Sequence, residues 1–317
     1  LGFTHAIQRK LSKDYDLSFN GCAIVTHDYQ LRVYKPNPRA NFEFIQSKNP
    51  PVLTKHKTSS PPIIEEGKMN LTTSIIIEVS KDYNTYEIFN LETNEIQKIT
   101  NMMWNNYGRI LSEYMFIKNF RQSKLEKYLE IEGKEIFEEI KKNGEPVVFI
   151  SGHFNNFELM AMEIEKSGVS VAAIYRPLNN IFLNKIMESI RKKYICKHQI
   201  KKGISGIREI LQFCKKGFSI ALMIDQRVSE GIKSNLFGQP ALTTTIPAQL
   251  VKKFGYKIVP IYIERINKLN YKIKINRPIK FDKNETIESI TDKLNNWLEK
   301  MISIKPNQWI WSHNRWK

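Results

Sequence analysis

The chain has 317 residues and a mass of 37.2 kDa, which is enough for one large α/β domain or two smaller ones with a buried core. Hydrophobic residues make up 41% and charged residues 26% of the chain, and this balance excludes wholesale disorder. The 49 Lys and Arg against 32 Asp and Glu give a formal charge of +17, so the surface attracts anions such as nucleic acid, an anionic membrane leaflet or an acidic carrier protein.

Three cysteines, Cys22, Cys196 and Cys214, are too few and too scattered for a disulfide framework or a cysteine-based zinc site. A reducing compartment is therefore expected. No stretch approaches the ~18 consecutive apolar residues of a membrane-spanning helix, so no spanning segment is predicted.

The first 68 residues differ in character from the rest of the chain. Short apolar runs such as Cys22–Val25 could be strands, but proline pairs at 50–51 and 61–62 and the Asn37-Pro38 step punctuate the segment and indicate loose order. The pattern predicts two parts: a poorly patterned N-terminal segment over residues 1–68 and a main domain over residues 69–317.

From about residue 95 onward, the apolar spacing alternates between helix and strand periodicity. It predicts helices over residues 99–114, 124–129, 133–142, 156–166, 181–194, 204–216, 247–254 and 286–303. It predicts strands over residues 146–151, 169–175, 219–224, 258–263 and 271–275. Strands that alternate with helices indicate an α/β fold with a mainly parallel central sheet flanked by helices. In such sheets, functional residues lie in the loops that follow the carboxyl ends of the strands.

Gly152 and His153 directly follow the predicted strand 146–151, and Glu158 lies five positions after the histidine. Residues five apart do not face each other on one helix, but a loop histidine and a carboxylate in the next helical turn can meet. A carboxylate that orients an imidazole allows the ring to accept a proton from a hydroxyl. We therefore predict that His153 and Glu158 are catalytic and that Gly152 lets the backbone approach a substrate.

Polar residues also follow two other predicted strands. Arg176 follows the strand 169–175 and is either a surface residue or a clamp for a phosphate or a sugar carboxylate. Asp225 and Gln226 follow the strand 219–224, and Asp225 is either a turn residue or a group that orients Arg176 or a substrate hydroxyl. These three residues are the predicted substrate-binding set, together with Gly152.

The segment Ser-Gly-His-Phe-Asn-Asn-Phe-Glu over residues 151–158 resembles the His-x4-Glu/Asp signature of glycerolipid-type acyltransferases. More specifically, it is similar to the lipid A biosynthesis late acyltransferases, the lauroyl and myristoyl transferases. Further blocks agree in order and spacing at residues 102–109, 175–177, 225–226, 237–238, 243–247 and 306–316. The resemblance covers about residues 95–317 and leaves out residues 1–68, which are expected to be foreign to that family.

The resemblance implies an O-acyltransferase of lipopolysaccharide biosynthesis. Such an enzyme moves a fatty acyl chain from acyl carrier protein to a hydroxyl of a lipid A precursor, without a metal, a further cofactor or a covalent acyl-enzyme. It also implies a peripheral position on the cytoplasmic face of a bacterial inner membrane. The donor protein, the phosphorylated acceptor and the leaflet are all anionic partners for a chain of charge +17.

Two alternatives remain at this point. An acyltransferase for another glycolipid or a lysophospholipid would use the same residues on a different acceptor. A basic nucleic-acid-binding protein would account for the pI of about 9.6 and the lysine pairs. This second reading lacks the glycine-rich or aromatic signatures of RNA-binding folds and a recognisable DNA-reading helix, so no nucleic-acid partner is expected.

Overall fold

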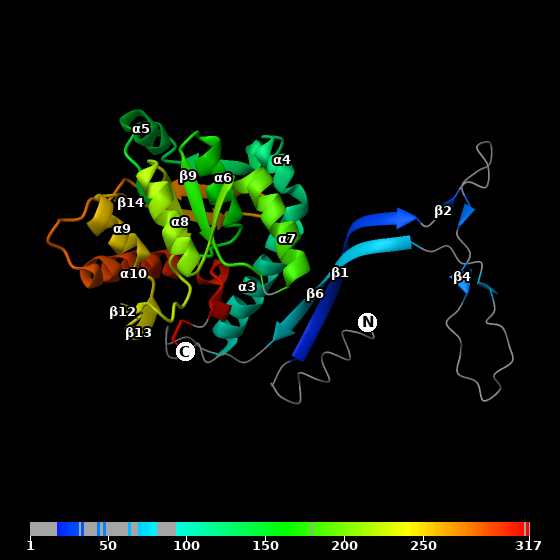
Figure 1. Cartoon of the computed structure of the whole chain (residues 1–317). Helices are drawn as coiled ribbons and strands as arrows, with labels where there is room; N and C mark the ends of the chain where they lie inside the picture. Colours follow the sequence, from blue (N-terminus) through cyan, green and yellow to red (C-terminus); the bar gives the residue numbers. More distant parts are fainter. Residues whose placement is uncertain are drawn as a thin grey trace. The chain divides into compact units, whose positions relative to one another are not determined.

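The structure, a computed structural model, describes residues 18–31, 33–34, 43–44, 47–48, 63–64, 69–80, 93–178, 180–313 and 315–316. The chain divides into two compact units, Leu1–Asn84 and Thr85–Lys317 (Figure 1). The second unit contains every residue that the sequence analysis assigned to a site.

The first unit contains a long antiparallel ladder between β1 (Ser18–Leu31) and β6 (Met69–Ser80). Two short antiparallel pairs lie between them in the sequence: β2 (Val33–Tyr34) with β3 (Glu43–Phe44), and β4 (Ser47–Lys48) with β5 (Ile63–Ile64). The boundary expected from the sequence lies after residue 68. In the structure, β6 pairs with β1 inside the first unit, and the second unit begins at Thr85.

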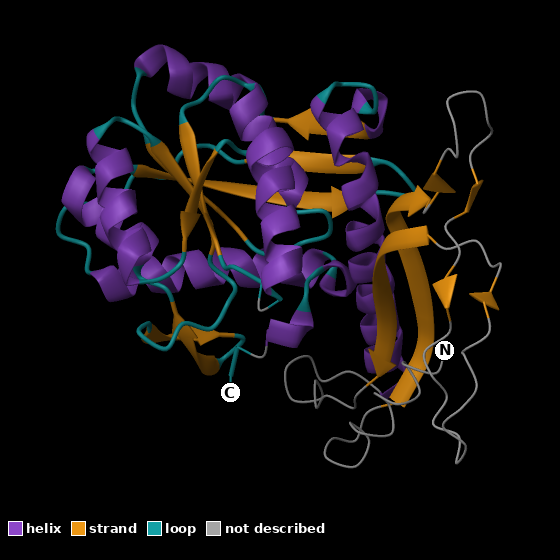
Figure 2. Ribbon diagram, turned by 45° about the vertical axis from the view of Figure 1, so that its right-hand side comes forward, coloured by secondary structure: helices purple, strands orange, loops and turns teal. Residues whose placement is uncertain are grey.

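A seven-stranded sheet with the order β10-β9-β11-β8-β14-β15-β7 forms the centre of the second unit (Figure 2). Its strands are β7 (Leu129–Glu132), β8 (Val147–Ser151), β9 (Val171–Tyr175), β10 (His198–Lys201), β11 (Ser219–Met223), β14 (Lys257–Arg265) and β15 (Tyr271–Ile275). The β14–β15 pair is antiparallel and the other neighbours in the sheet are parallel. The predicted α/β class with a mainly parallel sheet is confirmed.

Helices cover both faces of this sheet. They are α3 (Thr93–Glu113), α4 (Ile117–Arg121), α5 (Glu135–Asn143), α6 (Glu158–Lys166), α7 (Ile181–Ile190), α8 (Ile204–Lys215), α9 (Ile246–Phe254) and α10 (Ile287–Ile304). Because parallel crossovers are right-handed, α6 and α7 lie over one face and α8 and α9 over the other. No helix in the described part of the chain is both long enough and apolar enough to span a bilayer.

Several short elements differ from the prediction. Residues 124–129 were expected to be helical, but they form a 3₁₀ turn η2 (Glu126–Tyr128) followed by the edge strand β7. The edge strand β10 and the hairpin of β12 (Ile232–Leu236) and β13 (Gln239–Thr243) were not predicted. β7 alternates apolar with polar residues, and β10 and β12 are mostly polar, so these strands lack the apolar run that marks a central strand.

The core strand β8 determines where the site lies. All five of its residues are buried, because strands flank both its edges and helices cover both its faces. Its neighbour β11 is parallel and in register, with Met223 opposite Ser151. The residues that follow these two strands therefore emerge side by side at the same edge of the sheet.

Candidate active site

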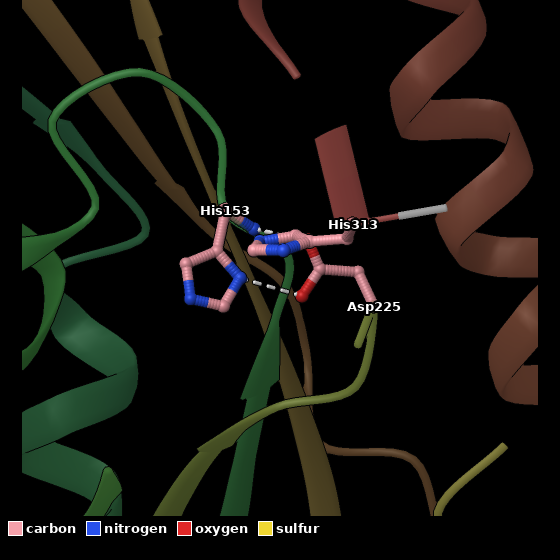
Figure 3. Close-up of side chains that lie close together, drawn as sticks. All are labelled: His153, Asp225 and His313. Atoms are coloured by element: carbon pink, nitrogen blue, oxygen red, sulfur yellow. Dashed lines mark hydrogen bonds and ion pairs between the residues drawn. The ribbon is translucent and has the colours of Figure 1, made fainter. Parts of the chain in front are cut away.

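His153 and Asp225 meet where β8 and β11 end (Figure 3). Each lies two residues beyond one member of the register pair Ser151–Met223. The Ile224 N–H donates to the Ser151 carbonyl at 2.9 Å, which extends the pairing one residue beyond β11. The equal offset from a common register pair brings the imidazole and the carboxylate together.

The carboxylate of Asp225 holds His153 at two points. Its Oδ1 lies 2.7 Å from His153 Nδ1, and its Oδ2 accepts the His153 backbone N–H at 2.6 Å. Burial by itself would raise the pKa of Asp225, whose side chain is 0% exposed, but the charge and hydrogen bonds of His153 hold that pKa well below its ordinary value. Asp225 is therefore ionised, and both of its oxygens only accept hydrogen bonds.

This pairing assigns the proton on the His153 ring. Because an ionised carboxylate cannot donate, Nδ1 carries the proton that Asp225 Oδ1 accepts, and the lone pair of the uncharged form of the ring is on Nε2. The side chain of His153 is 14% exposed, so the ring reaches the surface at one end. The pair has the geometry of a carboxylate-oriented general base.

Trp309 provides a third donor to Asp225. Its indole Nε1–H donates to Oδ2 at 2.8 Å, and its side chain is buried. Pairing of the C-terminal segment with the histidine loop brings it there: the Asn155 N–H donates to the Gln308 carbonyl and the Ile310 N–H donates to the His153 carbonyl. The Trp-rich C-terminal segment thus packs over the His153–Asp225 pair, and the hydrogen bond from Trp309 favours the ionised form of the Asp225 carboxylate.

Glu158 does not orient His153, which corrects the predicted pairing. Glu158 is the first residue of α6, and its Oε1 accepts hydrogen bonds from Arg191 Nε (2.9 Å), from Arg191 Nη2 (2.5 Å) and from the Tyr114 hydroxyl. Arg191 opens the π-helical turn η3 (Arg191–Ile195), and Tyr114 opens the 3₁₀ turn η1 (Tyr114–Phe116). The Glu158 carboxylate joins three segments in a buried ion pair, and the carboxylate bonded to His153 is that of Asp225.

The four predicted substrate-binding residues have different surroundings. Asp225 is fully buried, and its carboxylate is hydrogen-bonded to His153 and Trp309. Arg176 is exposed just beyond β9. The backbone carbonyl of Gln226 accepts a hydrogen bond from the Arg315 guanidinium at 2.7 Å. Gly152 is buried, and a Cβ there would lie 2.8 Å from the Phe154 ring, so close packing requires a glycine.

Two consecutive asparagines in the histidine loop were missed by the sequence analysis. Asn155 has a φ of 37°, a left-handed conformation that asparagine tolerates, and its amide donates to Gln308 Oε1 at 3.2 Å. The amide of Asn156 donates to Glu113 Oε2 at 2.8 Å, at the end of α3. Both asparagines are buried, so these bonds hold the loop that carries His153. The sequence signal for these buried asparagines is their position between two aromatic residues, Phe154 and Phe157.

His313 packs edge-on against the His153 ring, with centroids 4.7 Å apart. Within the described residues its Nε2 is shielded from solvent and has no hydrogen-bond partner. Burial, followed by the charge of His153, lowers the pKa of His313 from 6.5 to about 4. His313 is therefore neutral at neutral pH.

Replacing His313 by Phe is expected to weaken the dependence of stability on pH between 6.5 and about 4. In that window the unfolded chain binds a proton on this histidine and the folded chain does not, so His313 makes stability fall as the pH falls from 6.5. Denaturant titrations at about pH 7 and about pH 4.5 measure the effect. H313F should lose less stability than the parent chain between the two pH values, and equal losses would contradict the assignment.

Sequence comparison finds relatives of the second unit among known proteins. Residues 88–317 match the sequence model of the family described as "Bacterial lipid A biosynthesis acyltransferase". The lipid A biosynthesis myristoyltransferase of Escherichia coli (strain K12) is 24% identical over 196 residues, which is 59% of this chain and 58% of the relative. Lipid A biosynthesis acyltransferase 1 of Shigella flexneri is 24% identical over 188 residues, which is 57% of this chain and 56% of the relative. The chain thus spans less than three fifths of these two relatives.

The N-terminal part matches a different family. Residues 1–136 match the sequence model of the CRISPR-associated protein Csy2, and the Csy2 protein of Pseudomonas aeruginosa (strain UCBPP-PA14) is 30% identical over 81 residues. That alignment covers 26% of this chain and 24% of the relative.

The lipid A match covers well over half of the chain and includes the His153 loop, the strand ends of the site and the Trp-rich C-terminus. The resemblance inferred from the sequence motifs is therefore confirmed. The chain belongs to the bacterial lipid A biosynthesis acyltransferase family.

Proposed function

We propose that the second unit is an O-acyltransferase that moves a fatty acyl chain from acyl carrier protein to a hydroxyl of a lipid A precursor. The observation that carries the proposal is the His153–Asp225 pair at the carboxyl ends of β8 and β11, in a chain of the lipid A acyltransferase family. A lipid hydroxyl is a poor nucleophile at neutral pH, whereas a thioester is already activated. The enzyme therefore has to supply a base.

In the proposed reaction, Nε2 of His153 removes the hydroxyl proton while the hydroxyl oxygen attacks the thioester carbon. The new oxygen–carbon bond forms, the carbon–sulfur bond breaks, and the imidazolium returns its proton to the departing thiolate. Asp225 holds Nδ1 and stabilises the imidazolium through the 2.7 Å contact.

Direct transfer is favoured over a cysteine-bound acyl intermediate. Cys196 and Cys214 are buried, and burial raises the pKa of the Cys196 thiol to about 12. A protonated, inaccessible thiol is a poor nucleophile. The proposed transfer therefore takes place in a complex that holds the donor and the acceptor together.

Two basic residues at the carboxyl ends of neighbouring strands favour an anionic substrate. Arg176 follows β9 and Lys202 follows β10, and the Lys202 N–H donates to the Tyr175 carbonyl at 2.9 Å, so the two cations extend from neighbouring strand ends. Burial, followed by the charge of Arg176, lowers the pKa of Lys202. The two side chains suit a phosphate of the acceptor or of the donor's prosthetic group.

Mass spectrometry of lipid A, after expression of the chain in a host without its own late acyltransferases, tests this function. The expected result is one additional acyl group on the lipid A of the host. His153→Ala, checked for folding by circular dichroism, should reduce that product by ~10²–10⁴-fold. Unmodified lipid A together with newly acylated lysophospholipid would assign the enzyme to a different acceptor. Acylation by the His153→Ala chain within about threefold of the parent would overturn the role of His153 as the base.

We also expect the protein to bind the cytoplasmic leaflet peripherally. Exposed apolar side chains of α3 and η1, including Leu111, Met115 and Phe116, lie near the exposed Lys118 on a chain of charge +17. The chain should sediment with anionic vesicles at low salt and be largely released at about 0.5 M salt, where the Debye length is about 4 Å. Equal binding to neutral and anionic vesicles would contradict an electrostatic contribution.

A further inference from the structure

The side chains of His153, Asp225 and His313 form a compact set of metal-ligating groups (Figure 3). One ligand atom from each residue lies within 4.8 Å of the others. The three residues come from separate segments: the loop after β8, the loop after β11 and the 3₁₀ turn η5 (Trp311–His313). The proposed transfer reaction uses the first two, and it assigns no task to His313.

His313 is suited to be a ligand. Its Nε2 is shielded from solvent without a hydrogen-bond partner in the described part of the chain. An unpaired buried nitrogen is costly for a protein, and a metal ion removes that cost.

We propose that His153, Asp225 and His313 form a zinc site whose occupation switches the acyltransferase off. Two imidazoles and one carboxylate with a fourth position open to water make up a ligand set that zinc accepts in tetrahedral geometry. Zinc–ligand bonds of about 2.0–2.2 Å place the ligand atoms about 3.3 Å apart. The 2.7 Å contact between Nδ1 and Oδ1 therefore opens by about half an ångström as His313 closes on the ion.

The inhibitory effect follows from which nitrogen the ion takes, and this part rests on the proposed function. In the metal-free enzyme, Nδ1 of His153 carries the ring proton and Nε2 carries the lone pair that acts as the base. Zinc binds the Nδ1 lone pair, so the single ring proton moves to Nε2, and no proton is gained or lost overall. A ring protonated at Nε2 cannot accept the proton of a substrate hydroxyl.

The charges around the site limit how tightly zinc binds, and the ligand types select zinc over magnesium. Arg315 and Arg176 both act on His313 through their positive charge, so two cationic groups oppose a dication in the site. Arg315 is held by the carbonyls of Ile224 and Gln226 and cannot move away freely. Zinc should therefore bind reversibly rather than as a permanent structural ion. Magnesium, which prefers an all-oxygen octahedral shell, should not bind at the same concentration.

Direct binding is tested with cobalt(II), whose visible absorption reports tetrahedral coordination, followed by displacement with zinc. The full chain should give a cobalt spectrum that His313→Phe and Asp225→Asn each remove. His198→Gln is the matched control, because His198 packs against Phe213 and Phe218 away from the site. The chain also contains His5, His27 and His56, so the readout is the difference between variants. A spectrum that is unchanged in both H313F and D225N would overturn the site.

The inhibition is measured as the fraction of each variant's own metal-free rate. Zinc should inhibit the parent chain and H198Q alike, and H313F should require about tenfold more zinc or higher for the same inhibition. Magnesium at equal concentration controls for ionic strength. Equal zinc sensitivity of H313F and the parent would reject the switch even if cobalt binds. If the chain shows no acyl transfer at all, the proposed function fails, while the cobalt measurement still decides whether the metal site exists.

Discussion

Asp225→Asn is expected to lower turnover by ~10²–10⁴-fold while the fold stays intact. The asparagine oxygen can still accept the hydrogen bonds that Oδ2 receives from the His153 N–H and from Trp309 Nε1. Its amide NH₂ then faces Nδ1 of His153 and donates to it. The ring proton moves to Nε2, so the lone pair that accepts the substrate proton is lost.

Steady-state rates of the variants measure this coupling. Because His153 and Asp225 act as one unit, the double variant His153→Ala with Asp225→Asn should be little slower than His153→Ala alone. Trp309→Phe should lower turnover less than Asp225→Asn does. It removes one hydrogen-bond donor to Asp225 but leaves the contact between Asp225 Oδ1 and His153 Nδ1 in place. Losses that multiply in the double variant would show that the two residues act independently. A D225N rate within about threefold of the parent would exclude Asp225 as the partner of the base.

Glu158→Leu is expected to destabilise the second unit by about 3–5 kcal/mol, because it leaves a buried arginine without its carboxylate. The side chains of Glu158 and Arg191 are only 6% and 14% exposed, so water compensates little for the lost partner. The Tyr114 hydroxyl loses its acceptor as well. The double variant Glu158→Leu with Arg191→Met replaces the ion pair by apolar groups and should recover most of the loss.

Tryptophan fluorescence during denaturant titration follows this change in the second unit alone, because all five tryptophans of the chain lie after residue 84. The pH dependence of turnover separates a structural role of Glu158 from a catalytic one. Glu158→Leu protein that remains folded should show the same pH dependence of turnover as the parent chain, because Asp225 rather than Glu158 contacts the imidazole. Normal stability combined with a shifted acid limb in Glu158→Leu would restore Glu158 as the partner of His153.

The central elements could be predicted from the sequence because their burial leaves a clear pattern. The apolar run of β8 marks a strand covered on both faces, and the three- and four-residue spacing of α10 marks a helix with one buried stripe. The edge strands β7 and β10 have no such run: β7 alternates between partly buried and exposed positions, and β10 contains one buried residue, Ile200. A pattern that depends on burial is weakest where burial is incomplete.

The sequence by itself determined the chemistry of the site: a histidine after one buried strand, and acidic and basic groups after others. It could not determine which carboxylate meets the imidazole. Glu158 is close to His153 in the chain, but as the first residue of α6 its carboxylate meets Arg191 and Tyr114. Asp225 is 72 residues away, and only the placement of β11 beside β8, with Met223 opposite Ser151, brings it to the ring. Strand order results from the packing of the whole sheet, and the spacing of residues along one strand contains no record of which strand lies beside it.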